Sequence, residues 1–139
     1  MTLSHLIKQF NHKKIEKMNK LILIIRILLG LLLIVFGSNK FIDFLPAIEF
    51  ANPDAGALFG ALAGSYIMKT VGLIEVIAGL LLVINKAVPF ALVILAPISI
   101  NIILFHLTLD PANIGPGAFV FLLNIFLIFK YWDKYKTLF

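Results

Sequence analysis

The chain has 139 residues, no cysteine, a formal net charge of +5 and a mean hydropathy of +1.05. Hydrophobic residues make up 61% of it and charged residues 14%, whereas soluble domains carry about 25% charged residues. The composition therefore excludes a soluble protein and predicts a membrane protein with room for about four spans of roughly 20 residues. The absence of cysteine excludes thiol–disulfide chemistry, iron–sulfur clusters and cysteine zinc sites on this chain. The basic residues adjoin apolar segments, which favours the bilayer over nucleic acid as partner.

Residues 1–19 form a basic tail in which apolar residues recur at spacings of three and four. This spacing favours a short amphipathic helix on a membrane surface, and a solvated tail is the alternative. The apolar residues are Leu3, Leu6, Ile7 and Phe10. Met18, followed by asparagine and lysine, also has the features of a native start, so either Met1 or Met18 can begin the native chain.

Residues 20–135 are expected to form an all-α, integral membrane four-helix bundle with spans at about 21–41, 66–84, 88–109 and 117–131. The first apolar segment contains Arg26 and is not followed by a small-residue cleavage site, so it is interpreted as a retained span and not a signal peptide. Residues 132–139 form a cytoplasmic tail. Between the first two spans, Asn52-Pro53-Asp54 has the chemistry of a helix start. The helix that follows is too short to span and is predicted to be interfacial or re-entrant.

The distribution of lysines predicts how the chain is oriented in the membrane, because cytoplasmic loops are enriched in basic residues. With both termini in the cytoplasm, at most two lysines, Lys40 and Lys69, fall on the outer side. The other nine fall on the cytoplasmic side: Lys8, Lys13, Lys14, Lys17, Lys20, Lys86, Lys130, Lys134 and Lys136.

Arg26 and Glu75 are the two most costly residues in the predicted spans, since a charge at mid-membrane costs about 2.5–3.5 kcal/mol. Counting 1.5 Å per residue, they lie about 7–8 Å and about 13–14 Å from the inner ends of their helices, a difference that an arginine side chain can bridge. We expect them to pair, directly or through a water. A protonated, neutral Glu75 is the alternative.

Small residues flank these charges at helical spacing, which is typical of close helix packing in lipid. The first span carries one such stripe and the second span another, so the two helices are predicted to meet at their glycines. The alternative interpretation is an ion pair that only fixes the register of the helices. The stripes consist of Arg26, Gly30, Leu33, Gly37 and Lys40 in the first span and of Gly72, Glu75 and Gly79 in the second.

Further polar residues are candidates for a site. Lys40, Lys69 and His106 are predicted near the outer side, where they would line the entrance to a polar cavity. His106 is either an interfacial residue or a proton donor or acceptor, because histidine is the side chain that ordinarily changes charge near neutral pH. Asn101 and Asn124 lie at middle depth and either bond across helices or bind a ligand. A single histidine within the spans excludes bis-histidine haem in one chain and gives no metal cluster.

Four segments together resemble the DoxX family of small four-helix bacterial membrane proteins, over residues 18–135. They are RILLG from Arg26, GSNKF from Gly37, GLIEVIAGLLL from Gly72 and NIILFH at Asn101–His106. The resemblance implies a multi-pass protein of the bacterial inner membrane. It also implies that Arg26, Gly30, Gly37, Lys40, Glu75, Gly79 and His106 match the family's recurring polar and small residues.

The DoxX family takes its name from a subunit associated with thiosulfate:quinone oxidoreduction, and some relatives are tied to membrane redox complexes. For this chain the resemblance implies an accessory, redox-associated subunit that offers a polar intramembrane site to a quinone or lipid-like ligand and is not an enzyme on its own. No cofactor other than a quinone is implied, and a larger membrane complex or a homo-oligomer is the expected assembly. The alternatives are a structural scaffold subunit and a small-solute transporter, which with four spans would need to oligomerise.

Overall fold

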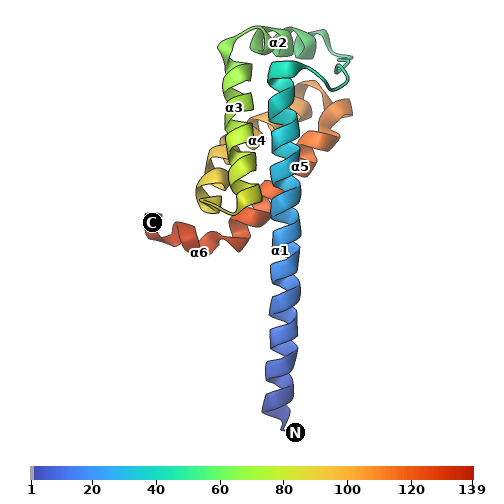
Figure 1. Ribbon diagram of the computed structural model, residues 1–139. Coiled ribbons are helices and arrows are strands. Elements are labelled where there is room, and N and C mark those ends of the chain that lie inside the picture. Colours follow the sequence, from blue (N-terminus) through green and yellow to red (C-terminus); the bar gives the residue numbers. More distant parts are fainter. Residues whose placement is uncertain (1) are drawn as a thin grey trace.

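The computed structural model describes residues 2–139, and every regular element in them is helical (Figure 1). The prediction of an all-α chain with four membrane-spanning helices and a short helix between the first two is confirmed, because four helices are long and apolar enough to cross a bilayer. The elements are α1 (Leu3–Ile42), α2 (Pro53–Ala63), α3 (Tyr66–Ile84), α4 (Val88–Leu109), α5 (Ile114–Lys130) and α6 (Trp132–Tyr135), with 3-10 turns η1 (Pro111–Asn113) and η2 (Lys136–Leu138).

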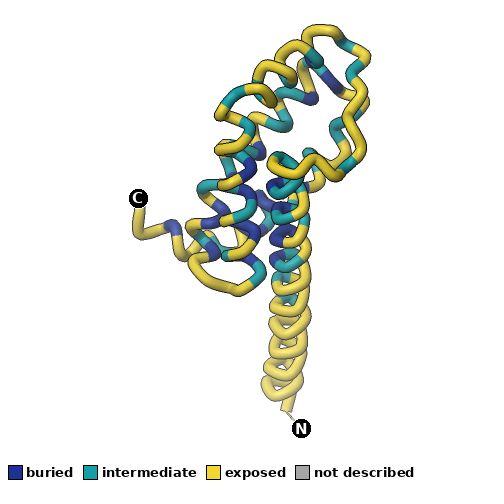
Figure 2. The backbone as a smooth tube through the Cα atoms, turned by 45° about the horizontal axis from the view of Figure 1, so that its top comes forward, coloured by how far each residue is buried: buried dark blue, intermediate teal, exposed yellow. Residues whose placement is uncertain are grey.

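Helix α1 is 40 residues long, about 60 Å at 1.5 Å per residue. Its N-terminal half extends beyond the other helices as an exposed stalk (Figures 1 and 2). The basic tail is therefore helical and continues into the first span without a break. Leu3 and Phe10 are 74% and 69% exposed on this stalk, and its position on a membrane surface stays a prediction.

Helices α1 and α3 form the most extensive helix pair of the bundle, and they touch at two pairs of glycines. A Cβ atom on Gly79 would lie 2.6 Å from the carbonyl oxygen of Gly30, and one on Gly37 would lie 2.7 Å from that of Gly72. No side chain fits at these distances. The backbones can approach this closely only because both partners in each contact are glycine, as in other closely packed membrane helices.

Leucines fill the centre of the bundle, where α1, α3, α4 and α5 meet. The fully buried leucines of this core are Leu29, Leu33, Leu82, Leu92, Leu95 and Leu127. The outward faces of the same helices carry many exposed apolar side chains. An apolar outer surface is what a helix bundle presents to lipid, and it agrees with the composition of the chain.

Helix α2 lies across one end of the bundle (Figure 1); we call this the α2 end. Its start follows the prediction, because Asn52 is the N-cap, its Oδ1 accepts a hydrogen bond of 2.9 Å from the backbone N–H of Asp54, and Pro53 occupies the first turn. At the other end α3 turns into α4, and α5 leads into α6; we call this the α6 end. There the hydroxyl of Tyr135 donates a hydrogen bond of 2.7 Å to the carbonyl of Pro89.

Candidate functional site

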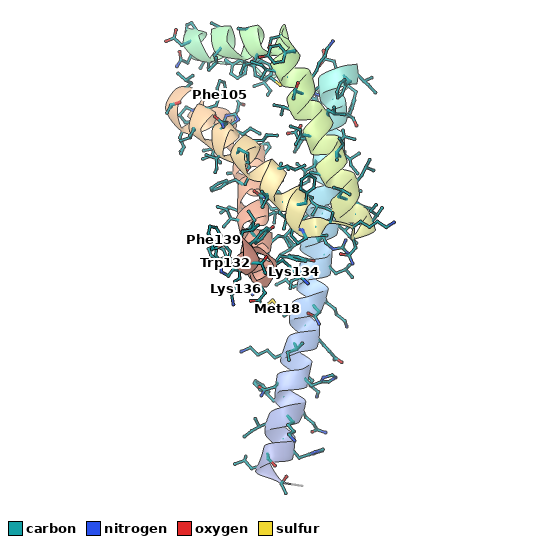
Figure 3. All side chains as sticks on the ribbon, turned by 90° about the vertical axis from the view of Figure 1, so that its left-hand side faces the viewer. Met18, Phe105, Trp132, Lys134, Lys136 and Phe139 are labelled. Atoms are coloured by element: carbon teal, nitrogen blue, oxygen red, sulfur yellow. The ribbon has the colours of Figure 1, made fainter. Side chains whose placement is uncertain are left out.

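A cavity of about 470 Å³ lies at the α2 end, among α2, α3, α4 and the connection that precedes α2. Most of its lining is apolar, and the labelled Phe105 lies at the end of α4 nearest α2 (Figure 3). The apolar lining residues are Ile48, Phe50, Phe59, Leu62, Ile67, Met68, Val71, Pro97, Ile98, Ile102 and Phe105. Lined this way, the cavity suits a hydrophobic ligand.

Aromatic rings form one wall of the cavity. The ring of Phe50 lies 5.1 Å from that of Phe59 and 6.0 Å from that of Phe105, the second contact being edge-to-face. Phe105 in turn contacts the imidazole of His106 at 5.3 Å. One ring thus comes from the irregular connection before α2, one from α2 and one from α4, and together they form a continuous surface. Sequence reasoning missed this wall, because Phe50 lies in a segment without helical periodicity.

Three of the polar residues predicted to form a site line this cavity: Lys40, Asn101 and His106. Lys40 is held by two contacts, since its Nζ lies 2.6 Å from Oε2 of Glu75 and also donates to the carbonyl of Phe36 at 3.3 Å. Glu75 is only 3% exposed. The charge of the lysine is therefore neutralised within the protein, at the edge of the cavity.

His106 is paired with Asp110, one helical turn further along the chain. Its Nδ1 lies 3.1 Å from the backbone oxygen of Asp110 and 3.2 Å from the carboxylate Oδ2. Oδ2 is buried and has no hydrogen bond within the described part of the chain, although Nδ1 of His106 approaches it. The side-chain amide of Asn113 donates to Oδ1 of Asp110 at 2.9 Å and to the carbonyl of Glu49 at 3.1 Å. These two hydrogen bonds connect the end of α4 to the segment before α2.

The contact between Asp110 and the imidazole was not predicted from the sequence. The signal was present, because residues four positions apart on a helix lie on the same face. The backbone oxygen of Asp110 accepts a hydrogen bond from a protonated Nδ1, and the nearby carboxylate also favours a proton on that nitrogen. The other nitrogen, Nε2, has no hydrogen bond among the described residues and lies on the side of the ring near Gly117 of α5.

The expected pairing of Arg26 with Glu75 is wrong. Nη1 of Arg26 donates instead to the backbone carbonyl of Leu82, in the last turn of α3. The final carbonyls of a helix lack N–H partners of their own, and a cation is favoured at that end of the helix dipole. Arg26 therefore caps α3 at the α6 end, away from the cavity that Lys40 and His106 line.

Of the remaining predicted residues, Asn124 and Lys69 lie outside the cavity, whereas Asn101 lines it. Asn124 is buried between helices, where its amide donates to the carbonyl of Leu92 at 3.1 Å and accepts from the hydroxyl of Ser99 at 3.1 Å. Lys69 is exposed on α3 and does not line the cavity. The amide of Asn101 bonds within its own helix, to the carbonyl of Pro97 at 2.8 Å.

Comparison with known proteins gives one match. The sequence model of the DoxX family matches residues 21–107, from the start of the first span to the residue after His106. This is more than half of the chain, and the matched segment includes Lys40, Glu75 and the whole of α2 and α3. No curated protein and no solved structure matches the chain.

Proposed function

The chain belongs to the DoxX family, and from this premise we propose that it binds a quinone or a similar amphipathic ligand in the cavity at the α2 end, as an accessory subunit of a membrane redox system. The observation that carries the proposal is the cavity itself. A volume of about 470 Å³ with aromatic walls and a few polar side chains lies within the usual range of about 300–1,000 Å³ for small-molecule sites.

The polar groups around the cavity suit the head of a quinone, whose carbonyl oxygens accept hydrogen bonds. His106, with Nδ1 against Asp110, offers Nε2, and the amide of Asn101 lies on the same helix, five residues earlier. Phe50 and Phe105 supply faces on which a planar ring can stack. An apolar tail would extend among the isoleucines of α3 and α4.

The ion pair of Lys40 and Glu75 supports a role for this end of the molecule beyond packing. Ionisable groups within a membrane usually mark a functional site. The pair also favours the second candidate, a scaffold subunit, because it joins α1 to α3. The two functions differ in one measurable property, since a scaffold shows no stabilisation by a quinone.

The test is thermal unfolding of the purified chain in detergent with increasing decylubiquinone, and with 1-decanol as the matched tail that lacks a quinone head. A ligand at a hundred times its dissociation constant stabilises the folded state by about 2.7 kcal/mol, which corresponds to a rise in Tm of about 5–10 °C for a chain of this size. We expect this rise with decylubiquinone and a smaller one with 1-decanol. Equal rises, or none, would contradict the proposal.

Two variants localise the effect. Leu62→Trp places a larger side chain into the cavity from α2 and is expected to abolish stabilisation by the quinone. Lys69→Gln removes a charge from an exposed position outside the cavity and is expected to leave it unchanged. A quinone response that survives Leu62→Trp would place the ligand elsewhere on the protein.

The distribution of lysines supports an orientation with both termini in the cytoplasm, and the family resemblance supports a location in the bacterial inner membrane. In this orientation the cavity opens near the outer face of the membrane. The α6 end, with Lys86 and Lys130, lies near the cytoplasm.

A further inference from the structure

A second hollow, of about 240 Å³, lies at the α6 end, between the first span, the turn from α3 to α4 and the end of α5. It shares no residue with the cavity at the α2 end. Its lining combines one cation, three uncharged polar side chains and two aliphatic ones: Arg26, Asn19, Asn85, Tyr131, Ile22 and Leu23.

Among the described residues that line this hollow, Arg26 is the only charged one, and it is 6% exposed. Its one hydrogen bond within residues 2–139, to the carbonyl of Leu82, uses a single N–H, whereas a guanidinium has five. None of the salt bridges in the described part of the chain involves Arg26. A buried cation without an anionic partner is costly in a membrane. An anion bound to the remaining N–H groups of the Arg26 guanidinium would reduce this cost.

Lysines adjoin three of the residues that line the hollow. Each of three lining residues has a lysine as its neighbour in the chain: Asn19 precedes Lys20, Asn85 precedes Lys86, and Tyr131 follows Lys130. All three lysines are exposed, and none forms a salt bridge among the described residues. They come from three different parts of the fold, so they create a positive field around Arg26 of the kind that attracts anionic headgroups.

We propose that this hollow binds the phosphate of an anionic phospholipid through Arg26. The planar fork of a guanidinium matches two oxygens of a phosphate and forms charge-assisted hydrogen bonds with them. The amides of Asn19 and Asn85 and the hydroxyl of Tyr131 add donors for the phosphate or the glycerol. Ile22 and Leu23 provide an apolar surface for the first methylenes of the acyl chains. This binding does not depend on the quinone site.

The test is native mass spectrometry of the purified chain, titrated in neutral detergent with phosphatidylglycerol or with phosphatidylcholine. Phosphatidylglycerol is expected to bind about tenfold more tightly, because only it brings a net negative charge. Arg26→Gln should remove this preference, with a loss of about tenfold to a hundredfold in affinity, the usual effect of losing a hydrogen bond between charged groups. Arg26→Lys should retain part of it, since it keeps the charge and loses the fork.

Two further variants keep the test valid if Arg26→Gln does not fold, because Arg26 also caps α3. Asn85 has a φ of 58°, so Asn85→Gly removes the amide without straining the left-handed backbone. Lys86→Gln removes one of the surrounding charges. Each variant should bind phosphatidylglycerol several-fold more weakly than the unmodified chain. Lys69→Gln, the same charge change at the α2 end, should not.

Three results would overturn the proposal. The first is equal affinity for phosphatidylglycerol and phosphatidylcholine in the unmodified chain. The second is a loss in Lys69→Gln as large as the loss in Lys86→Gln, which would show a general effect of charge. The third is displacement of the lipid by inorganic phosphate at millimolar concentration, which would identify a site for a free anion and not for a lipid.

Discussion

The ammonium of Lys40 lies 2.6 Å from the carboxylate of Glu75, and this ion pair joins α1 to α3 within one turn of the contact between Gly37 and Gly72. The two side chains are 19% and 4% exposed. The glycines bring the backbones together, and the close approach in turn removes the charges from lipid. Because Lys40 also lines the cavity, the same pair contributes to the packing of the helices and to the wall of the candidate site.

Removal of one partner of this pair is expected to destabilise the protein. Glu75→Gln leaves the ammonium of Lys40 without a carboxylate. The loss should lie towards the lower end of the about 3–5 kcal/mol measured for buried pairs, because Lys40 is partly exposed and can turn towards the membrane surface. Unfolding of the variant in detergent, followed by circular dichroism, measures this loss.

The double variant Lys40→Met with Glu75→Leu is the control for this prediction. It removes both charges and retains similar volumes, so it should recover most of the stability that Glu75→Gln loses. A double variant as unstable as the single one would show that shape, and not charge pairing, determines stability at this position.

The sequence identified both charged helix faces but joined the wrong residues across them. The contacts Gly30–Gly79 and Gly37–Gly72 run in antiparallel register, and the two glycines on each helix are seven positions apart. This register places Arg26 beside the end of α3, and it places Glu75 about 9 Å along the axis from Lys40 but about 12 Å from Arg26. Had the glycines been paired in register first, the sequence would have favoured Lys40.

Side-chain direction explains the rest of the difference. Helical side chains lean towards the N-terminus of their own helix. Lys40 therefore leans towards Glu75, as its contact with the carbonyl of Phe36 shows, and Glu75 on the antiparallel helix leans towards Lys40. Arg26 leans away from Glu75, towards Leu82. Depth alone, which was the basis of the prediction, contains no information on direction.

The cavity was predictable only in part. Lys40, Asn101 and His106 were identifiable because polar residues are costly in a membrane-spanning segment and therefore indicate a functional or packing role. The aromatic wall was not, because Phe50 reaches the cavity from an irregular connection whose path depends on tertiary contacts such as that between Asn113 and the carbonyl of Glu49. Local sequence patterns specify helices and their faces, but not the course of such a connection.

Gly79→Ala is expected to separate α1 from α3. The added Cβ would lie 2.6 Å from the carbonyl oxygen of Gly30 and 2.9 Å from a side-chain carbon of Ile34, so the helices must shift, at a cost of about 1–3 kcal/mol. Gly60→Ala is the matched control, because a Cβ there has no neighbour within 4 Å and alanine favours the helix by about 0.5–1 kcal/mol. Unfolding midpoints that move alike in both variants would contradict the close contact.

Tyr135→Phe tests the contact between α6 and the start of α4. The variant loses the hydrogen bond to the carbonyl of Pro89, which is worth about 0.5–1.5 kcal/mol. Burial raises the pKa of the Tyr135 phenol above its usual value, and the neighbouring Tyr131 adds to the shift. The neutral phenol is thus favoured by folding, so its contribution is complete below about pH 10 and is lost as the pH rises through the raised pKa.

Thermal unfolding from about pH 8 to about pH 11 measures this effect. The unmodified chain should lose more stability over this range than Tyr135→Phe, which has no phenol to ionise. Tyr66→Phe is the control, because Tyr66 is 78% exposed; it should follow the unmodified chain. Parallel curves for the unmodified chain and Tyr135→Phe would show that the phenol does not stabilise the contact.

The two asparagines of the third and fourth spans are expected to differ in effect. Asn124→Leu removes the bonds to the carbonyl of Leu92 and the hydroxyl of Ser99, at a cost of about 0.6–2 kcal/mol. Asn101→Leu removes only a bond within α4 at an exposed position and should leave stability unchanged, while weakening the response to decylubiquinone. Destabilisation by Asn101→Leu equal to that by Asn124→Leu would assign both residues to packing.

The proposed orientation can be tested directly, because the chain has no cysteine and every introduced thiol is the only one present. Asp54→Cys at the start of α2, Lys86→Cys in the turn between α3 and α4 and Lys13→Cys on the stalk all replace exposed residues. Nine lysines at the α6 end and on the stalk, against two near the α2 end, should hold the basic side in the cytoplasm. A membrane-impermeant maleimide added to intact cells is therefore expected to label Asp54→Cys alone. The other two variants should react only after permeabilisation, and labelling of Lys86→Cys in intact cells would show that the bundle has the opposite orientation.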